Sequence, residues 1–182
     1  MELVKAQKEV DLFQTLLANF NSQHLLQLLL REINHNPQHP KLPLPELLKI
    51  YHQSLGEKMV PLSIFSHPLA PTAALCKYLR ENENLNNKEI GAVLHLQEKS
   101  VWATYTRARK QKKAKFVLGG DYYFLPLSVF SDSRLSTLEQ IIQHLQSTYH
   151  LKNGQIAKLL HKSSNTIAVL AKRGKVKRGL MK

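Results

Sequence analysis

The chain has 182 residues, an apolar fraction of 43% and a formal net charge of +13 at neutral pH. This length and composition fit one or two small domains with a hydrophobic core. The single cysteine, Cys76, excludes a disulfide framework and a cysteine-based zinc finger, and it fits a reducing compartment. We expect a cytoplasmic protein without membrane contact, because no apolar run is long enough to span a bilayer and the mixed-charge N-terminus does not resemble a signal peptide.

The N-terminal region, residues 1–59, carries no net charge. Its first apolar residues recur at steps of three and four, which predicts a helix, and Ser22 can cap a second helix that runs to about Ile33. Residues 1–33 therefore form either a homodimer interface or a helical cap on their own chain. A proline-rich loop, residues 34–45, and a short helix, residues 46–55, follow. The prolines disrupt the helical spacing of His35 and His39, so we predict no metal site.

Residues 60–113 contain three predicted helices, over Pro71–Asn82, from about Asn87, and over Glu98–Lys112. Only a few residues separate the second helix from the third. Two helices joined by such a tight turn form a helix-turn-helix unit, whose second helix can enter a DNA major groove. The turn needs a left-handed residue near His95, and histidine is enriched there among residues other than glycine.

A linker, residues 114–124, follows the third helix. The glycines at 119 and 120 and the flanking apolar residues predict a small β-hairpin. Tyr122 and Tyr123 either pack within that hairpin or stack on nucleic-acid bases.

Residues 125–182 repeat the pattern of residues 60–113. The segments 61–66 and 126–131 match at an offset of 65, and an offset of 66 then aligns the later apolar positions and both turn histidines, His95 and His161. We therefore expect an all-α fold with two tandem three-helix helix-turn-helix modules, 60–113 and 125–182. We also expect Gly174 to shorten the third helix of the second module.

All of the excess positive charge lies in the two repeats, with net +5 in residues 60–113 and net +8 in residues 125–182. Such charge favours nucleic-acid binding, although it also fits a solvated basic face. Two basic runs end the third helices, and we expect their side chains to contact phosphates. They are Arg107, Arg109, Lys110, Lys112 and Lys113 in the first module, and Lys172, Arg173, Lys175, Lys177 and Arg178 in the second.

The segments Glu89-Ile90-Gly91 and Gln155-Ile156-Ala157, each followed by a turn and a basic helix, resemble region four of bacterial sigma factors, the domain that binds the −35 promoter element. The resemblance covers about 45 residues in each repeat. It implies DNA-facing residues at Glu98, Lys99, Trp102 and Ala103, and at Ser164, Asn165, Ala168 and Val169. Trp102 either contacts the groove in this way or packs at the edge of the first helix.

These observations predict a sequence-specific transcriptional regulator that binds double-stranded DNA in the nucleoid. The alternatives are an architectural DNA binder of low specificity and an adaptor that binds the transcription machinery, for example RNA polymerase. We expect the first module to bind DNA better than the second, and we expect no catalytic activity, cofactor or metal, since no catalytic motif is present. The remaining candidate DNA-contacting residues are Lys88, Gln97, Ser100 and Thr104 in the first module, and Lys152, Lys162, Ser163 and Thr166 in the second.

Overall fold

The computed structural model describes residues 49, 52–53, 56–118 and 122–179. The chain divides into two compact units, residues 1–59 and residues 60–182. The helices expected within residues 1–33, the proline-rich loop, and His35 and His39 lie outside the described residues. Most of the described residues belong to the second unit, which contains both repeats.

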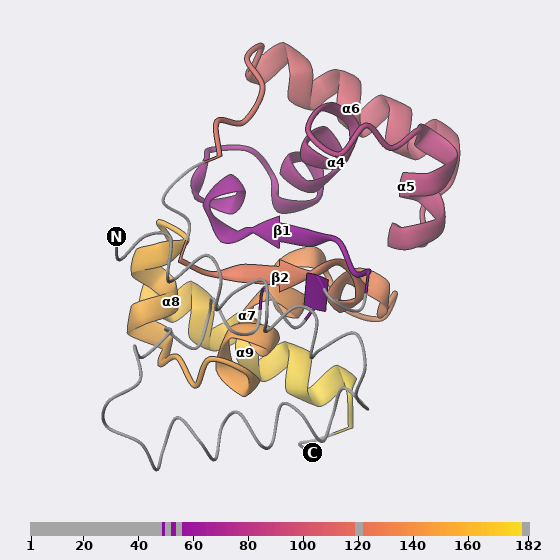
Figure 1. Cartoon of the computed structure of the whole chain (residues 1–182). Helices are drawn as coiled ribbons and strands as arrows, with labels where there is room; N and C mark the ends of the chain where they lie inside the picture. The colour runs from indigo at the N-terminus through magenta and orange to yellow at the C-terminus, as the bar shows by residue number, and fades with distance from the viewer. Residues whose placement is uncertain (1–48, 50–51, 54–55, 119–121, 180–182) are drawn as a thin grey trace, which may run out of the picture. The chain divides into compact units, whose positions relative to one another are not determined.

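The described residues are mostly helical, as predicted, and they include a short antiparallel pair of strands. In chain order the elements are β1 (Met59–Pro61), the 3-10 helix η1 (Leu62–Ser66), α4 (Pro71–Glu81), α5 (Asn87–Leu94), α6 (Glu98–Gln111), β2 (Phe124–Pro126), the 3-10 helix η2 (Leu127–Ser131), α7 (Thr137–Ser147), α8 (Asn153–Leu159) and α9 (Ser164–Lys177). We call α4–α6 the first module and α7–α9 the second module. Figure 1 shows the two modules on either side of the paired strands.

Local sequence determines where several helices begin. The Asn86 side chain accepts a hydrogen bond from the Glu89 backbone N–H, and the Glu89 carboxylate accepts one from the Asn86 N–H, at 2.9 and 2.7 Å. Ser136 and Glu139 form the same reciprocal pair at the start of α7. These capping boxes satisfy N–H groups that the first turn of a helix leaves without partners. At α4, Pro71 instead occupies the first turn, where its missing N–H costs nothing.

The two modules repeat each other closely in three dimensions. Asn84 and His95 in the first module and His150 and His161 in the second have left-handed backbones, with φ between 51° and 58°. The left-handed conformation predicted for His95 and His161 is therefore confirmed. Each module packs its third helix on the other two around aliphatic residues with no exposed surface, which lie 66 residues apart in pairs. These residues are Leu75, Leu79, Ile90 and Val101 in the first module, and Ile141, Leu145, Ile156 and Ile167 in the second.

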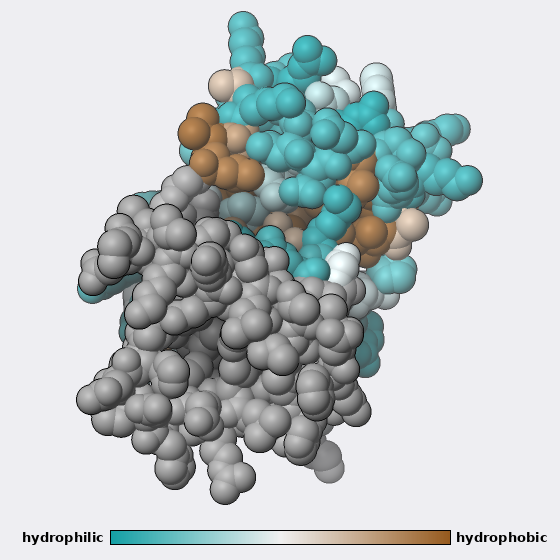
Figure 2. All heavy atoms as spheres, viewed as in Figure 1, coloured by the Kyte–Doolittle hydropathy of each residue, from teal (hydrophilic) through white to brown (hydrophobic). Residues whose placement is uncertain are grey.

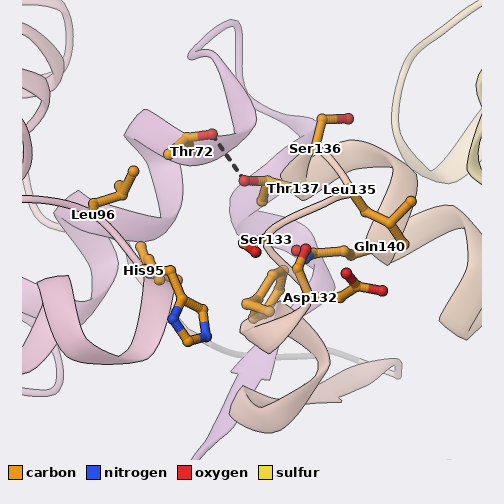
Figure 3. Close-up of a pocket in the computed structure, with 11 residues that line it drawn as sticks. Thr72, His95, Leu96, Asp132, Ser133, Leu135, Ser136, Thr137 and Gln140 are labelled. Carbon is orange, nitrogen blue, oxygen red and sulfur yellow. Dashed lines mark hydrogen bonds between the residues drawn. The ribbon is translucent and has the colours of Figure 1, made fainter. Parts of the chain in front are cut away.

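The segments that precede the modules join them. β1 pairs with β2, and the buried rings of Phe65 and Phe130 meet with centroids 6.0 Å apart. The Thr72 and Thr137 hydroxyls, at the starts of α4 and α7, share a hydrogen bond of 2.8 Å (Figure 3). The modules are therefore held together by a packed and hydrogen-bonded seam.

Two sequence-based expectations are wrong. The described residues 112–118 contain no strand, and β2 pairs with β1 rather than with the preceding linker, so the predicted hairpin between the modules does not form. Gly174 does not shorten its helix either, because α9 runs through it and has 14 residues, as α6 does. A Cβ at Gly174 would lie 2.2 Å from Nε2 of Gln143 on α7, so the glycine permits the close approach of the two helices.

Candidate nucleic-acid interface

The first three turns of α6 present polar side chains to solvent. Val101 and Ala108 are buried on the inner face of the helix, whereas Glu98, Lys99 and Ser100 are exposed. Two features place α6 in this position. The left-handed His95 ends α5, and the Leu96 backbone N–H donates to the Gly91 carbonyl at 2.9 Å, so the chain turns sharply between the two helices.

Trp102 lies on the same outward side of α6. Its side chain is 60% exposed, so most of the indole faces solvent and is not buried at the edge of α4. The expectation that Trp102 packs at that edge is therefore wrong, whereas a surface position leaves the side chain available for contact with a partner. A large exposed aromatic side chain is typical of interaction surfaces.

The C-terminal half of α6 is basic and free of internal ion pairs. Arg107, Arg109 and Lys110 are exposed, and no acidic group within the described ranges pairs with them. Figure 2 shows a largely hydrophilic surface over the first module in this view. The cationic side chains in the last turn also interact favourably with the negative end of the helix dipole.

A buried ion pair holds α6 on α4. Lys77 has no exposed surface, and its Nζ donates to both carboxylate oxygens of Glu81 at 2.7 and 2.6 Å. The Tyr105 hydroxyl of α6 donates to the same carboxylate at 3.2 Å. Burial, and then the negative charge of Glu81, raise the pKa of Tyr105. Lys77 therefore belongs to the fold and not to the basic surface.

The second module uses part of its basic helix end in a different way. Glu139 on α7 is buried, and it accepts a 2.7 Å hydrogen bond from Nζ of Lys177, while Nε of Arg173 lies 3.7 Å away. Burial alone would raise the pKa of Glu139, but the hydrogen bonds from Lys177 and from the Ser136 N–H outweigh it, so the pKa is lowered. Thus the two predicted phosphate-contacting residues that α9 places beside Glu139 already neutralise a carboxylate of their own module.

A second acidic residue lies near the same helix end. Nε of Arg178 is 3.4 Å from Oδ2 of Asp132, and the Arg134 guanidinium donates to both oxygens of that carboxylate at 2.9 and 3.0 Å. The hydrogen bonds from Arg134 lower the pKa of Asp132 to about 2. Lys172 and Lys175 are exposed without an ion pair in this part of the chain. The free positive charge of α9 is therefore smaller than its sequence indicates.

None of the residues predicted to contact DNA is buried. Ala103 and Thr104 are partly exposed, and all the others are exposed. Gln97 and Ser163 occupy the N-cap positions of α6 and α9, Lys152 occupies that of α8, and Lys88 lies in the first turn of α5. The exposed predicted residues on or beside the third helices are Glu98, Lys99, Ser100, Trp102, Arg107, Arg109 and Lys110 in the first module, and Lys162, Ser164, Asn165, Thr166, Ala168, Val169, Lys172 and Arg173 in the second.

A shallow pocket of about 190 Å³ lies between the modules. His95 and Leu96 line it from the first module, and Asp132, Ser133 and Gln140 line it from the second (Figure 3). In the part of the chain that the structure describes, no group of three or more histidine, cysteine, aspartate or glutamate residues could hold a metal ion. Within the same residues, no helix has the length and apolar character needed to cross a membrane.

Comparison with known proteins found no matching family model, no matching curated protein and no matching solved structure.

Proposed function

We propose that this chain is a DNA-binding protein of the helix-turn-helix class, acting in the nucleoid as a sequence-specific transcriptional regulator. The observation that carries the proposal is α6: a helix placed by a tight turn, with exposed polar residues at its start and exposed, unpaired basic residues at its end. The recognition helix of a helix-turn-helix unit contacts base edges through its N-terminal residues.

The chemistry of α6 fits this division of roles. The Lys99 ammonium can donate to the O6 and N7 acceptors of guanine, and the Glu98 carboxylate can accept from the amino group of cytosine. Arg107, Arg109 and Lys110 lie two to three turns further along the helix, and their exposed charges suit phosphates, which position a protein on DNA without specifying sequence. Lys99 and Glu98 would therefore supply specificity, and the basic end would supply affinity.

The proposal is tested by selecting binding sites from a random duplex library at two salt concentrations and then comparing three variants. Lys99→Ala should change the preferred sequence. Arg107→Ala should weaken binding to all sequences about equally and reduce the slope of log affinity against log salt by about one. Lys158→Ala removes an exposed α8 lysine outside the candidate interface, so this matched control should leave the preferred sequence unchanged. Absence of duplex binding at low salt would overturn the proposal and favour an adaptor that binds RNA polymerase or another protein.

A second function, architectural DNA binding with low sequence specificity, is favoured by one observation. Ala103, Ala168 and Val169 occupy positions expected to face DNA, and their side chains have no hydrogen-bonding groups. Such residues can contact thymine methyl groups but cannot form bidentate hydrogen bonds with base edges. Tight, salt-dependent binding without any recovered motif would support this function and overturn the regulator.

A further inference from the structure

The seam between the modules joins equivalent parts of the repeat to each other. β1 and β2 are equivalent segments, and they pair with each other in antiparallel orientation. Phe65 and Phe130 are also equivalent, and their rings are in contact. In a two-fold symmetric interface, residues on or beside the axis meet their own counterparts. These contacts therefore place an approximate two-fold axis between the modules.

Contacts further from the seam agree with this axis. α5 of the first module contacts η2 of the second half, and α8 of the second module contacts η1 of the first half. This reciprocity is what an isologous interface requires, whereas a translational repeat would give one contact without the other. Val60, Phe65, Leu125 and Phe130 are buried, so the modules are packed together around the axis.

We propose that a single chain is the covalent equivalent of a helix-turn-helix dimer, and that its DNA target is a pair of half-sites in inverted orientation. This inference rests on the proposed function. Two modules related by a two-fold axis can occupy one duplex together only if their half-sites are related by a two-fold axis as well, because operator symmetry follows protein symmetry. The half-site of the first module dominates, since Arg107, Arg109 and Lys110 are unpaired, whereas Arg173 and Lys177 in the second module lie beside Glu139.

The first test locks the seam in the full chain. Oγ1 of Thr72 and Oγ1 of Thr137 are 2.8 Å apart, so cysteines at both positions should form a disulfide under mild oxidation. The single variants Thr72→Cys and Thr137→Cys are the controls, and they also show whether buried Cys76 participates. Circular dichroism verifies that each variant folds. Failure of a folded double variant to cross-link would overturn the two-fold arrangement, whether or not the protein binds DNA.

The second test uses the oxidised double variant and the unmodified chain on designed duplexes. The duplexes carry the selected half-site once, as a direct pair, or as an inverted pair over a range of spacings. An inverted pair at one spacing should bind one chain roughly tenfold tighter than a single half-site, since the second contact is intramolecular. The locked form should bind that duplex as tightly as the unmodified chain.

The possible failures are distinguishable from one another. Preference for direct pairs, equal affinity for single sites, two chains on one inverted pair, two duplexes on one chain, or loss of binding on locking would each overturn this inference and leave the proposed function intact. No binding to any duplex would overturn the proposed function itself, and the cross-linking result would still decide the symmetry of the modules.

Discussion

Replacing either member of the Glu139–Lys177 pair should destabilise the second module, but by different amounts. The Glu139 side chain is 1% exposed, whereas that of Lys177 is 36% exposed. Removal of the lysine therefore leaves a carboxylate in a site that water does not reach. Removal of the carboxylate leaves an ammonium group that water can solvate.

The expected magnitudes follow from this asymmetry. Removing one partner of a fully buried ion pair costs about 3–5 kcal/mol. Lys177→Met should cost less, about 2–3 kcal/mol, because the Ser136 N–H still donates to Glu139 at 2.8 Å and Arg173 lies nearby. Glu139→Gln should cost about 1–2 kcal/mol, because the amide oxygen can still accept from the Ser136 N–H and only the charge-assisted hydrogen bond is lost.

Urea unfolding of the full chain, followed by circular dichroism at neutral pH, measures these costs. The double variant should lose less stability than the sum of the single variants, because neither of its side chains is left as an unpaired charge. A greater loss for Glu139→Gln than for Lys177→Met would refute the argument, as would strictly additive effects.

The same pair predicts a pH dependence. The pKa of Glu139 is lowered from its ordinary value of 4.5 in the folded chain, so its contribution is fully present above that value and is lost as pH falls through the folded pKa. The stability difference between the unmodified chain and Glu139→Gln should therefore shrink as pH falls below 4.5. A difference that stays constant down to pH 2 would contradict a stabilising ionised carboxylate at this position.

Three further predictions concern the modules. Gly91→Ala should lower stability by about 1–3 kcal/mol in thermal unfolding, because the added Cβ would lie 2.6 Å from the Leu96 carbonyl oxygen and the backbone must move; an unchanged melting temperature would contradict this contact. Gly174→Ala should destabilise the unmodified chain by clashing with Gln143, but it should stabilise the Gln143→Ala variant by up to about 1 kcal/mol through helix propensity, and the same sign in both backgrounds would refute this explanation. Cys76 should react slowly with a thiol reagent in the folded chain, because burial raises its pKa to about 12; reaction as fast as in urea would show that the site is open.

Features encoded within a few residues of the chain were predictable. The spacing of apolar side chains predicted the helices α4, α5 and α6, with ends that agree with the structure to within one residue where both ends were predicted. The offset of 66 residues predicted the second module, and the turn histidines predicted the left-handed backbone. Helical periodicity, caps and turn geometry depend mainly on neighbours in the sequence, and so they can be recognised without the fold.

Strand pairing was not predictable in the same way. Residues 122–125 have the pattern of a strand, but that pattern does not specify which segment supplies the partner. The nearest candidate was the linker before Gly119, whereas the actual partner is β1, which lies more than 60 residues away. β1 and β2 are equivalent parts of the repeat, so the pairing is a consequence of how the modules pack. Only the three-dimensional structure reveals the two-fold relationship on which the inverted half-sites depend.

The charge pattern shows most clearly what a count of residues cannot supply. By sequence the second module is the more basic, which favours it as the stronger DNA-binding module on electrostatic grounds alone. In the structure Glu139 lies beside Arg173 and Lys177, while its counterpart in the first module, Ala73, offers α6 no such partner. The first module therefore keeps more of its charge available to phosphates even though it carries less. Because the balance depends on one carboxylate, Glu139→Gln should steepen the salt dependence of DNA binding while lowering stability. An unchanged salt slope would show that the freed cations do not contact DNA.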